Sequence, residues 1–187
     1  MKTAWIWAMA LVLAIAVPAT GMEIGGATLP DTLTAGTREL TLNGAGLRRK
    51  FFVRVYAGGL YLTEKSDDAG AIVAADEPMA IRMHFVREGV SPENLIEAWN
   101  EGFDAATGGN IEPIRSGIEK FNGFFTEETR KDDVYDIIYT PEQGVRLYMR
   151  DRLMGVIPGL EFKRALFAIW LGEKPADESL KKGMLGR

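Results

Sequence analysis

The chain has 187 residues, of which 47% are hydrophobic and 26% are charged, and its formal net charge is −4. This balance is typical of a globular protein, and the length suits one domain with a sizeable core. Cysteine is absent, which excludes disulfides and thiolate chemistry. His84 is the only histidine, which argues against a zinc site or a serine triad. Acidic and basic residues are interleaved along the chain, so the sequence shows no basic patch for binding a nucleic acid.

The first 21 residues form a segment of their own. Lys2 places a positive charge ahead of the apolar run 4–17, and the small residues Ala19 and Gly21 follow at the positions that a signal peptidase reads. The run is shorter than the roughly 20 residues that a membrane span needs. We therefore predict a signal peptide over residues 1–21, one mature domain over 22–187, and no stable membrane insertion after cleavage.

The amino-terminal half of the mature chain predicts strands and then helices. Residues 40–47 and 51–62 are rich in β-branched and aromatic residues with glycines at the joints, and residues 79–87 predict a further strand. A helix follows, with Ser91 as N-cap and proline at its first position, and it is stopped by glycines at 108 and 109. A second helix is predicted over 112–125.

The carboxy-terminal half predicts a hairpin followed by helices. Residues 135–140 and 145–150 alternate between apolar and polar residues around a turn at 141–144. Residues 160–171 predict a buried central helix, and residues 176–185 a short last one. Because strands and helices do not alternate along the chain, the predicted fold class is α+β, an antiparallel sheet with helices on one face.

Residues 42–62 carry the most specific pattern. They contain Gly-x-Gly-x-Arg ending at Arg48, Lys-Phe at 50–51, and Val-Tyr-Ala-x-Gly-Leu-Tyr over 55–61. The chain resembles the chalcone-isomerase-like superfamily in these motifs, and it is most similar to the exported bacterial branch. The resemblance extends over residues 29–186. It implies an open-faced β-sandwich, with a large antiparallel sheet, a layer of helices and a cleft between them, and it implies no cofactor and a place in the bacterial periplasm.

The superfamily divides by function. A plant enzyme closes a chalcone to a flavanone without a cofactor, and relatives bind fatty acids with the carboxylate on the motif arginine and a nearby tyrosine. Carried onto this sequence, the arginine is Arg48 and the hydroxyl position falls on or next to Tyr56, with Trp99 and Asn100 on the helix where further pocket residues are expected. The segment between arginine and hydroxyl is shorter than in the enzyme, and tyrosine replaces its threonine. Catalytic residues are therefore left unassigned.

Strand parity gives a separate argument for the same residues. If residues 48–56 form one continuous strand, Arg48 and Tyr56 share a cationic and aromatic face, which suits a small-molecule site. A guanidinium also grips a carboxylate bidentately and keeps its charge. The opposite face then looks like core, and it carries Arg49, Phe51, Val53 and Val55.

Three hypotheses follow. The leading one is an exported, non-catalytic binding protein for a small amphipathic anion such as a fatty acid. The second is a cofactor-independent isomerase, an intramolecular lyase acting on a chalcone-like or other phenolic substrate. The third is a structural or partner-docking protein in which Arg48 only pairs with a surface acid such as Glu39 or Glu64.

Overall fold

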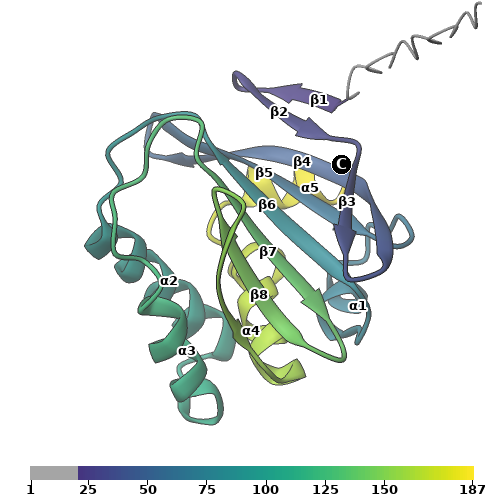
Figure 1. Cartoon of the computed structure of the whole chain (residues 1–187), viewed down its shortest axis with the longest axis vertical. Helices are drawn as coiled ribbons and strands as arrows, with labels where there is room; N and C mark the ends of the chain where they lie inside the picture. Colours follow the sequence, from purple (N-terminus) through teal and green to yellow (C-terminus); the bar gives the residue numbers. More distant parts are fainter. Residues whose placement is uncertain (1–20) are drawn as a thin grey trace, which may run out of the picture.

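A computed structural model describes residues 21–187. Seven strands form one antiparallel sheet in the order β3-β4-β5-β6-β7-β8-β9, and β1 pairs only with β2 (Figure 1). The strands are β1 (Gly21–Ile24), β2 (Ala27–Pro30), β3 (Thr32–Ala35), β4 (Arg38–Lys50), β5 (Val53–Leu62), β6 (Met79–Phe85), β7 (Val134–Thr140), β8 (Gly144–Met149) and β9 (Arg152–Ile157). The helices are α1 (Ala69–Ala74), α2 (Pro92–Thr107), a 3₁₀ turn η1 (Glu112–Ile114), α3 (Arg115–Asn122), α4 (Leu160–Leu171) and α5 (Glu178–Met184).

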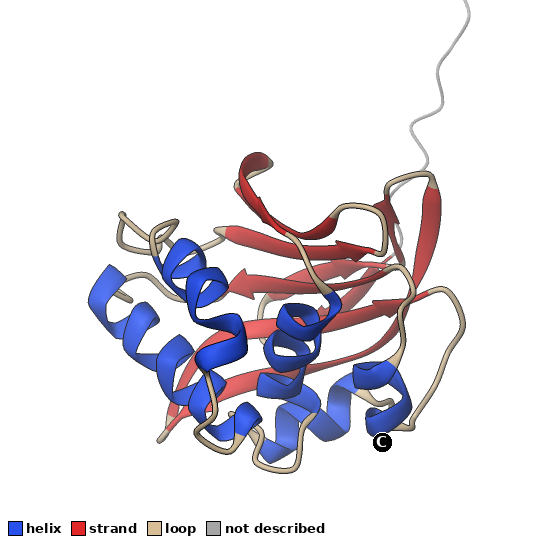
Figure 2. Ribbon diagram, turned by 90° about the horizontal axis from the view of Figure 1, so that it is seen from below, coloured by secondary structure: helices blue, strands red, loops and turns tan. Residues whose placement is uncertain are grey.

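The helices lie together on one side of the sheet, as Figure 2 shows. Side-chain alternation along β6 explains why: Met83 and Phe85 belong to the large core beneath the helices, whereas Ala80 belongs to a second cluster on the other face. The β1–β2 hairpin contributes Leu29 to that second cluster. The prediction of an α+β fold with helices on one face of an antiparallel sheet is confirmed.

Local signals in the sequence set the helix boundaries. The Ser91 hydroxyl accepts from the backbone N–H of Asn94 at 3.3 Å, Pro92 begins α2, and Gly108 ends the helix in the left-handed region with φ 61°. The predicted helix over 112–125 is shorter than expected, because its first turn is the 3₁₀ turn η1 and α3 ends at Asn122. Helix α1 was not predicted.

Helix α5 lies unusually close to strand β4. A side chain added at Gly44 would come within 2.8 Å of the backbone atoms Gly186 N and Met184 O, and one added at Gly183 would come within 3.0 Å of Gly46 Cα. The glycines therefore serve close contact between helix and strand, in addition to the bending that the sequence suggested.

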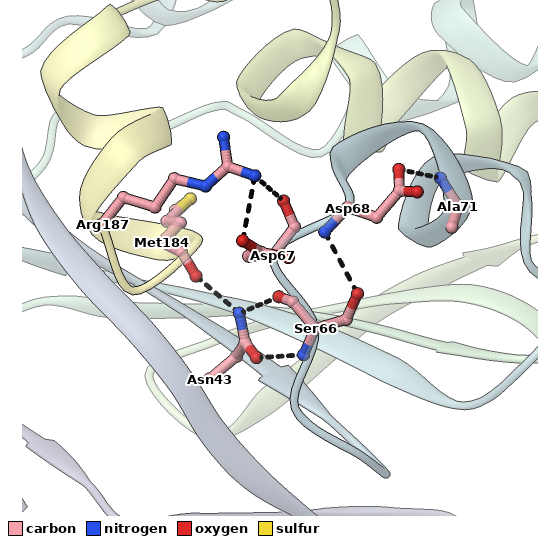
Figure 3. A network of polar contacts seen from close by, with 7 residues as sticks. All are labelled: Asn43, Ser66, Asp67, Asp68, Ala71, Met184 and Arg187. Atoms are coloured by element: carbon pink, nitrogen blue, oxygen red, sulfur yellow. Dashed lines mark hydrogen bonds and ion pairs between the residues drawn. The ribbon is translucent and has the colours of Figure 1, made fainter.

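Asn43 holds the end of the chain to the sheet (Figure 3). It sits at a register shift of β4, and its side-chain NH₂ donates to Ser66 O at 2.9 Å and to Met184 O at 2.8 Å. Its carbonyl oxygen accepts from Ser66 N at 2.8 Å. These contacts use most of the hydrogen-bonding capacity of a buried amide and tie α5 to the loop after β5.

The predicted signal peptide lies outside the described residues except for Gly21, which is the first residue of β1. Over residues 21–187, no helix has the length and apolar character needed to cross a membrane.

Candidate functional site

A cavity of about 520 Å³ lies between the joined ends of β4 and β5, helix α2 and the segment that links α4 to α5. Its walls are mostly apolar and include Val55, Met83, Phe85, Leu95 and Ile169. Volume and composition are those of a site for a small organic molecule.

The segment between Arg48 and Tyr56 is a hairpin, so the prediction of one continuous strand is wrong. Strand β4 ends at Lys50, Phe51 and Phe52 form the turn, and Arg48 pairs directly with Tyr56 across the two strands. A register shift follows, since Arg49 pairs with Arg54 and leaves Val55 as the extra residue. The expected core face is wrong for Phe51 and Val53, which are 88% and 42% exposed, whereas Val55 does pack against the core. All three line the cavity together with Arg48.

Arg48 is one of the lining residues of the cavity. Its guanidinium Nη1 lies 3.6 Å from Asp177 Oδ2 and also donates to the carbonyl oxygen of Arg49. The side chain is half-buried, at 23% exposure. The acid that pairs with Arg48 is therefore Asp177, in place of the expected Glu39 or Glu64.

Asp177 has a second task, because it caps α5. Its Oδ1 accepts from the backbone N–H groups of Ser179 at 2.9 Å and Leu180 at 3.1 Å, and its Oδ2 accepts from Arg49 N at 3.0 Å. Burial works against the charged form, but these backbone donors hold the pKa of Asp177 below its usual range. The carboxylate is therefore ionised at neutral pH.

Tyr56 supplies a hydroxyl beside Arg48. The group is buried and accepts a hydrogen bond of 2.9 Å from Trp170 Nε1. Burial raises the pKa of Tyr56 to about 12, and the Trp170 contact and Arg48 offset only part of that rise. The hydroxyl stays protonated at neutral pH, and its proton has no acceptor among residues 21–187.

Trp99 lines the cavity, and Asn100 does not. The Trp99 ring packs edge-on against Trp170 at 5.5 Å, and its buried Nε1 has no hydrogen-bond partner in the described chain. Asn100 is exposed and its Oδ1 accepts from Asn122 at 2.8 Å. Asn100 therefore points away from the cavity, toward α3. The residue of α2 that takes this place at the wall is Asn94.

The sequence reasoning missed the cationic mouth of the cavity, formed by the exposed lining residues Lys50, Arg87 and Lys174. None of them forms an ion pair with a described residue, and Glu101 is the acidic residue of the wall. Lys50 lies two residues from Arg48, in the Lys-Phe motif at 50–51. Arg87 and Lys174 come from distant segments, so no local signal joins them to the site.

A smaller pocket, of about 270 Å³, lies at the β8–β9 hairpin and offers less to an anion. Its arginine, Arg150, already binds Asp133 through two hydrogen bonds of 2.6 and 2.8 Å and pairs with Glu127 at 2.9 Å. Within residues 21–187, no group of three or more His, Asp or Glu side chains is placed to hold a metal ion.

Comparisons with known proteins agree with this architecture. A family model described as chalcone isomerase-like matches residues 21–186. Among solved structures, a fatty-acid binding protein from Arabidopsis thaliana matches with a TM-score of 0.68 and 16% sequence identity, over 86% of this chain and 92% of that one. No curated protein sequence matches. At this identity the structural likeness shows a common fold, including the predicted open-faced arrangement of sheet and helices.

Proposed function

Since the chain belongs to the chalcone isomerase-like family, we propose, from the geometry of its cavity, that it is a non-catalytic binding protein for a small amphipathic anion such as a fatty acid. One observation carries the proposal: Arg48 and Tyr56, whose hydroxyl is protonated, are cross-strand neighbours that both line a mostly apolar cavity of about 520 Å³. The fatty-acid binding of the Arabidopsis protein of the same fold supports the choice of ligand.

The polar and apolar lining residues of the cavity suit the two parts of such a ligand. A carboxylate at Arg48 gains a charge-assisted hydrogen bond, and the Tyr56 hydroxyl donates a second one. The tail lies against Val55, Met83 and Phe85, where each buried methylene contributes about 0.8 kcal/mol. The proposal needs no cofactor.

The same groups favour binding over catalysis. A tyrosine with a pKa of about 12 stays protonated at neutral pH and cannot take a proton from a substrate. His84 is remote from the cavity, because it alternates with Met83 and Phe85 along β6 and lies 3.5 Å from Asp132. Asp177 is the ionised carboxylate beside Arg48, but it accepts from four donors of the chain and is not a lining residue of the cavity, which makes it a poor general base.

Replacing Arg48 with alanine is expected to weaken the binding of a fatty acid about tenfold to a hundredfold while the fold is retained. A charge-assisted contact contributes about 1.5–3 kcal/mol to binding, whereas the long, partly exposed pair with Asp177 contributes about 0–1 kcal/mol to folding. Calorimetric titration of the wild type and of Arg48→Ala with oleate, at modest ionic strength, measures the change in affinity.

Arg49→Ala is the matched control. The Arg49 side chain is exposed and lies outside the cavity wall, and its contact with Asp177 uses the backbone N–H, which alanine keeps. Equal affinities in the wild type and both variants would refute the anion site at Arg48. An enzyme-dependent, stereoselective conversion of a chalcone that disappears in Arg48→Ala would instead support the isomerase.

We also propose that the protein is exported to the bacterial periplasm and belongs to the exported bacterial branch of its family. The charged start, the apolar run 4–17 and the small residues before Met22 support this proposal. Expressed in a bacterial host, the protein recovered outside the cytoplasm is expected to begin near Met22. An amino-terminal sequence that still begins at Met1 would refute the cleavage.

A further inference from the structure

The tip of the β4–β5 hairpin is an exposed aromatic turn with basic flanks. Phe51 is 88% exposed and Phe52 is fully exposed. The turn is preceded by Arg49 and Lys50 and is followed, after Val53, by Arg54. Exposing two adjacent phenylalanine side chains to water costs free energy compared with burying them, and the chain has a large apolar core. The turn also strains the backbone, since Phe51 adopts a positive φ of 57°.

The charge around this turn is uneven for an acidic protein. The whole chain carries −4, yet Arg49, Lys50 and Arg54 at the tip form no ion pair with any residue of 21–187. Arg87 and Lys174 extend the same positive field along the mouth of the cavity. An aromatic tip inside a positive field is complementary to the interface of an anionic lipid bilayer, where aromatic rings lie at the head groups and each basic residue adds attraction.

We propose that the turn Phe51–Phe52, with its basic flanks, docks on an anionic lipid bilayer and brings the mouth of the cavity against the lipid surface. The structural link is direct, because Lys50, Phe51 and Val53 belong to both the hairpin tip and the cavity wall. The docking itself rests on the exposed tip, and its role as a route for an amphipathic ligand rests on the binding function proposed above.

Phe52 separates docking from ligand binding. It is the more exposed of the two rings and lies outside the cavity wall, whereas Phe51 lines it. Phe52→Ser is therefore expected to weaken association with phosphatidylglycerol-containing vesicles about tenfold, through the loss of one inserted ring. Arg49→Gln combined with Arg54→Gln is expected to weaken it roughly tenfold to thirtyfold, at about a factor of five for each charge.

Arg38→Gln is the matched control for charge. Arg38 is exposed and begins the strand that Lys50 ends, so the two positions lie on the order of 40 Å apart along β4. Its replacement is expected to leave vesicle association unchanged. Vesicles of phosphatidylcholine alone are expected to bind the wild type weakly, because they lack the anionic head groups.

Sedimentation of the whole protein with each vesicle type measures association, and a parallel titration with oleate in vesicle-free buffer measures ligand affinity. The expected result is reduced association of Phe52→Ser with unchanged oleate affinity. Failure of the wild type to bind phosphatidylglycerol vesicles, or equal binding by Phe52→Ser, overturns the docking proposal, and in either case the oleate titration tests the binding function separately. If only the combined Arg49 and Arg54 variant binds the vesicles less well, the protein adsorbs by charge alone without inserting its aromatic rings. That result also overturns the docking proposal.

Discussion

Gly44→Ala is expected to lower the free energy of unfolding by about 3 kcal/mol or more, at the upper end of what overpacking costs. The added methyl group would meet Gly186 N and Met184 O within 2.8 Å and Gly183 O closer still. All three are backbone atoms, so no side chain can rotate away and α5 must move off β4. Urea unfolding, followed by circular dichroism and tryptophan fluorescence, measures the loss.

The displacement of α5 has a second, local effect. Leu180 and Met184 leave the core, and Asp177 no longer stands beside Arg48. Amide hydrogen exchange in α5 is expected to accelerate in the variant more than exchange in β6. Gly70→Ala is the control, because the nearest atom to its new methyl group would be 3.4 Å away and alanine favours helix α1. Equal losses of stability in the two variants would contradict the close approach at Gly44.

Lys163→Met is expected to cost about 3–5 kcal/mol of unfolding free energy, because three carbonyl oxygens lose their donor at roughly 1–3 kcal/mol each, offset in part by the removal of a buried charge. Lys163 is fully buried in α4, and its Nζ donates to the carbonyl oxygens of Ile72 at 2.9 Å, Val73 at 3.0 Å and Ala75 at 2.8 Å. These carbonyls end α1, where a helix has no donors of its own. Methionine fills similar space but leaves all three oxygens without a donor.

The pH dependence of stability gives Lys163 a separate signature. Burial, with a smaller contribution from Arg164, lowers the pKa of Lys163 from 10.5 to about 8. Between these values the unfolded chain binds more protons than the folded one, so the contribution of Lys163 to stability rises with pH. Above that window the trend reverses, since burial raises the pKa of Tyr61 and Tyr139.

The difference in unfolding free energy between wild type and Lys163→Met is therefore expected to change between about pH 8 and 10 and to be constant from pH 6 to 7. Urea titrations at these pH values measure it. Lys182→Met, at an exposed position of α5, is a control expected to cost less than about 0.5 kcal/mol. A loss of similar size in the Lys163 variant would show that its three contacts contribute little.

The sequence predicted those elements whose signals are local. Ser91 and Gly108 bounded α2, and the alternation of residues 135–150 predicted β7 and β8 with the turn between them. Helix α1 was missed because its stabilising contacts are distant: Asp68 caps its start, but Lys163 completes its end from another helix. The same limit applies to Asn43, whose partners Ser66 and Met184 cannot be identified from spacing.

The β4–β5 turn shows a different kind of failure. Residues 49–54 contain no glycine, proline, asparagine or aspartate, so nothing in them indicates a turn, and two aromatic residues favour a strand or core. Phe51 nevertheless takes the left-handed conformation that such turns demand. Tyr56 was placed beside Arg48 by the resemblance, and the hairpin brings the two together by cross-strand pairing instead of by shared strand parity.

The hydrogen bonds of Asp177 bear on how quickly the anion proposed above would exchange at Arg48. Four donors other than Arg48 reach this carboxylate: the backbone N–H groups of Arg49, Ser179 and Leu180, and the Ser179 hydroxyl. Asp177 thus restrains the Arg48 guanidinium before a ligand binds. Ordering a long side chain on binding costs roughly 0.5–1.5 kcal/mol, and this restraint removes part of that cost. At 3.6 Å it also gives up little when the guanidinium turns to a new partner. On the proposed function, a ligand carboxylate at Arg48 replaces this weak pair by a shorter charge-assisted contact. The residence time of the ligand is then set by both its head group and the withdrawal of its tail from the apolar wall.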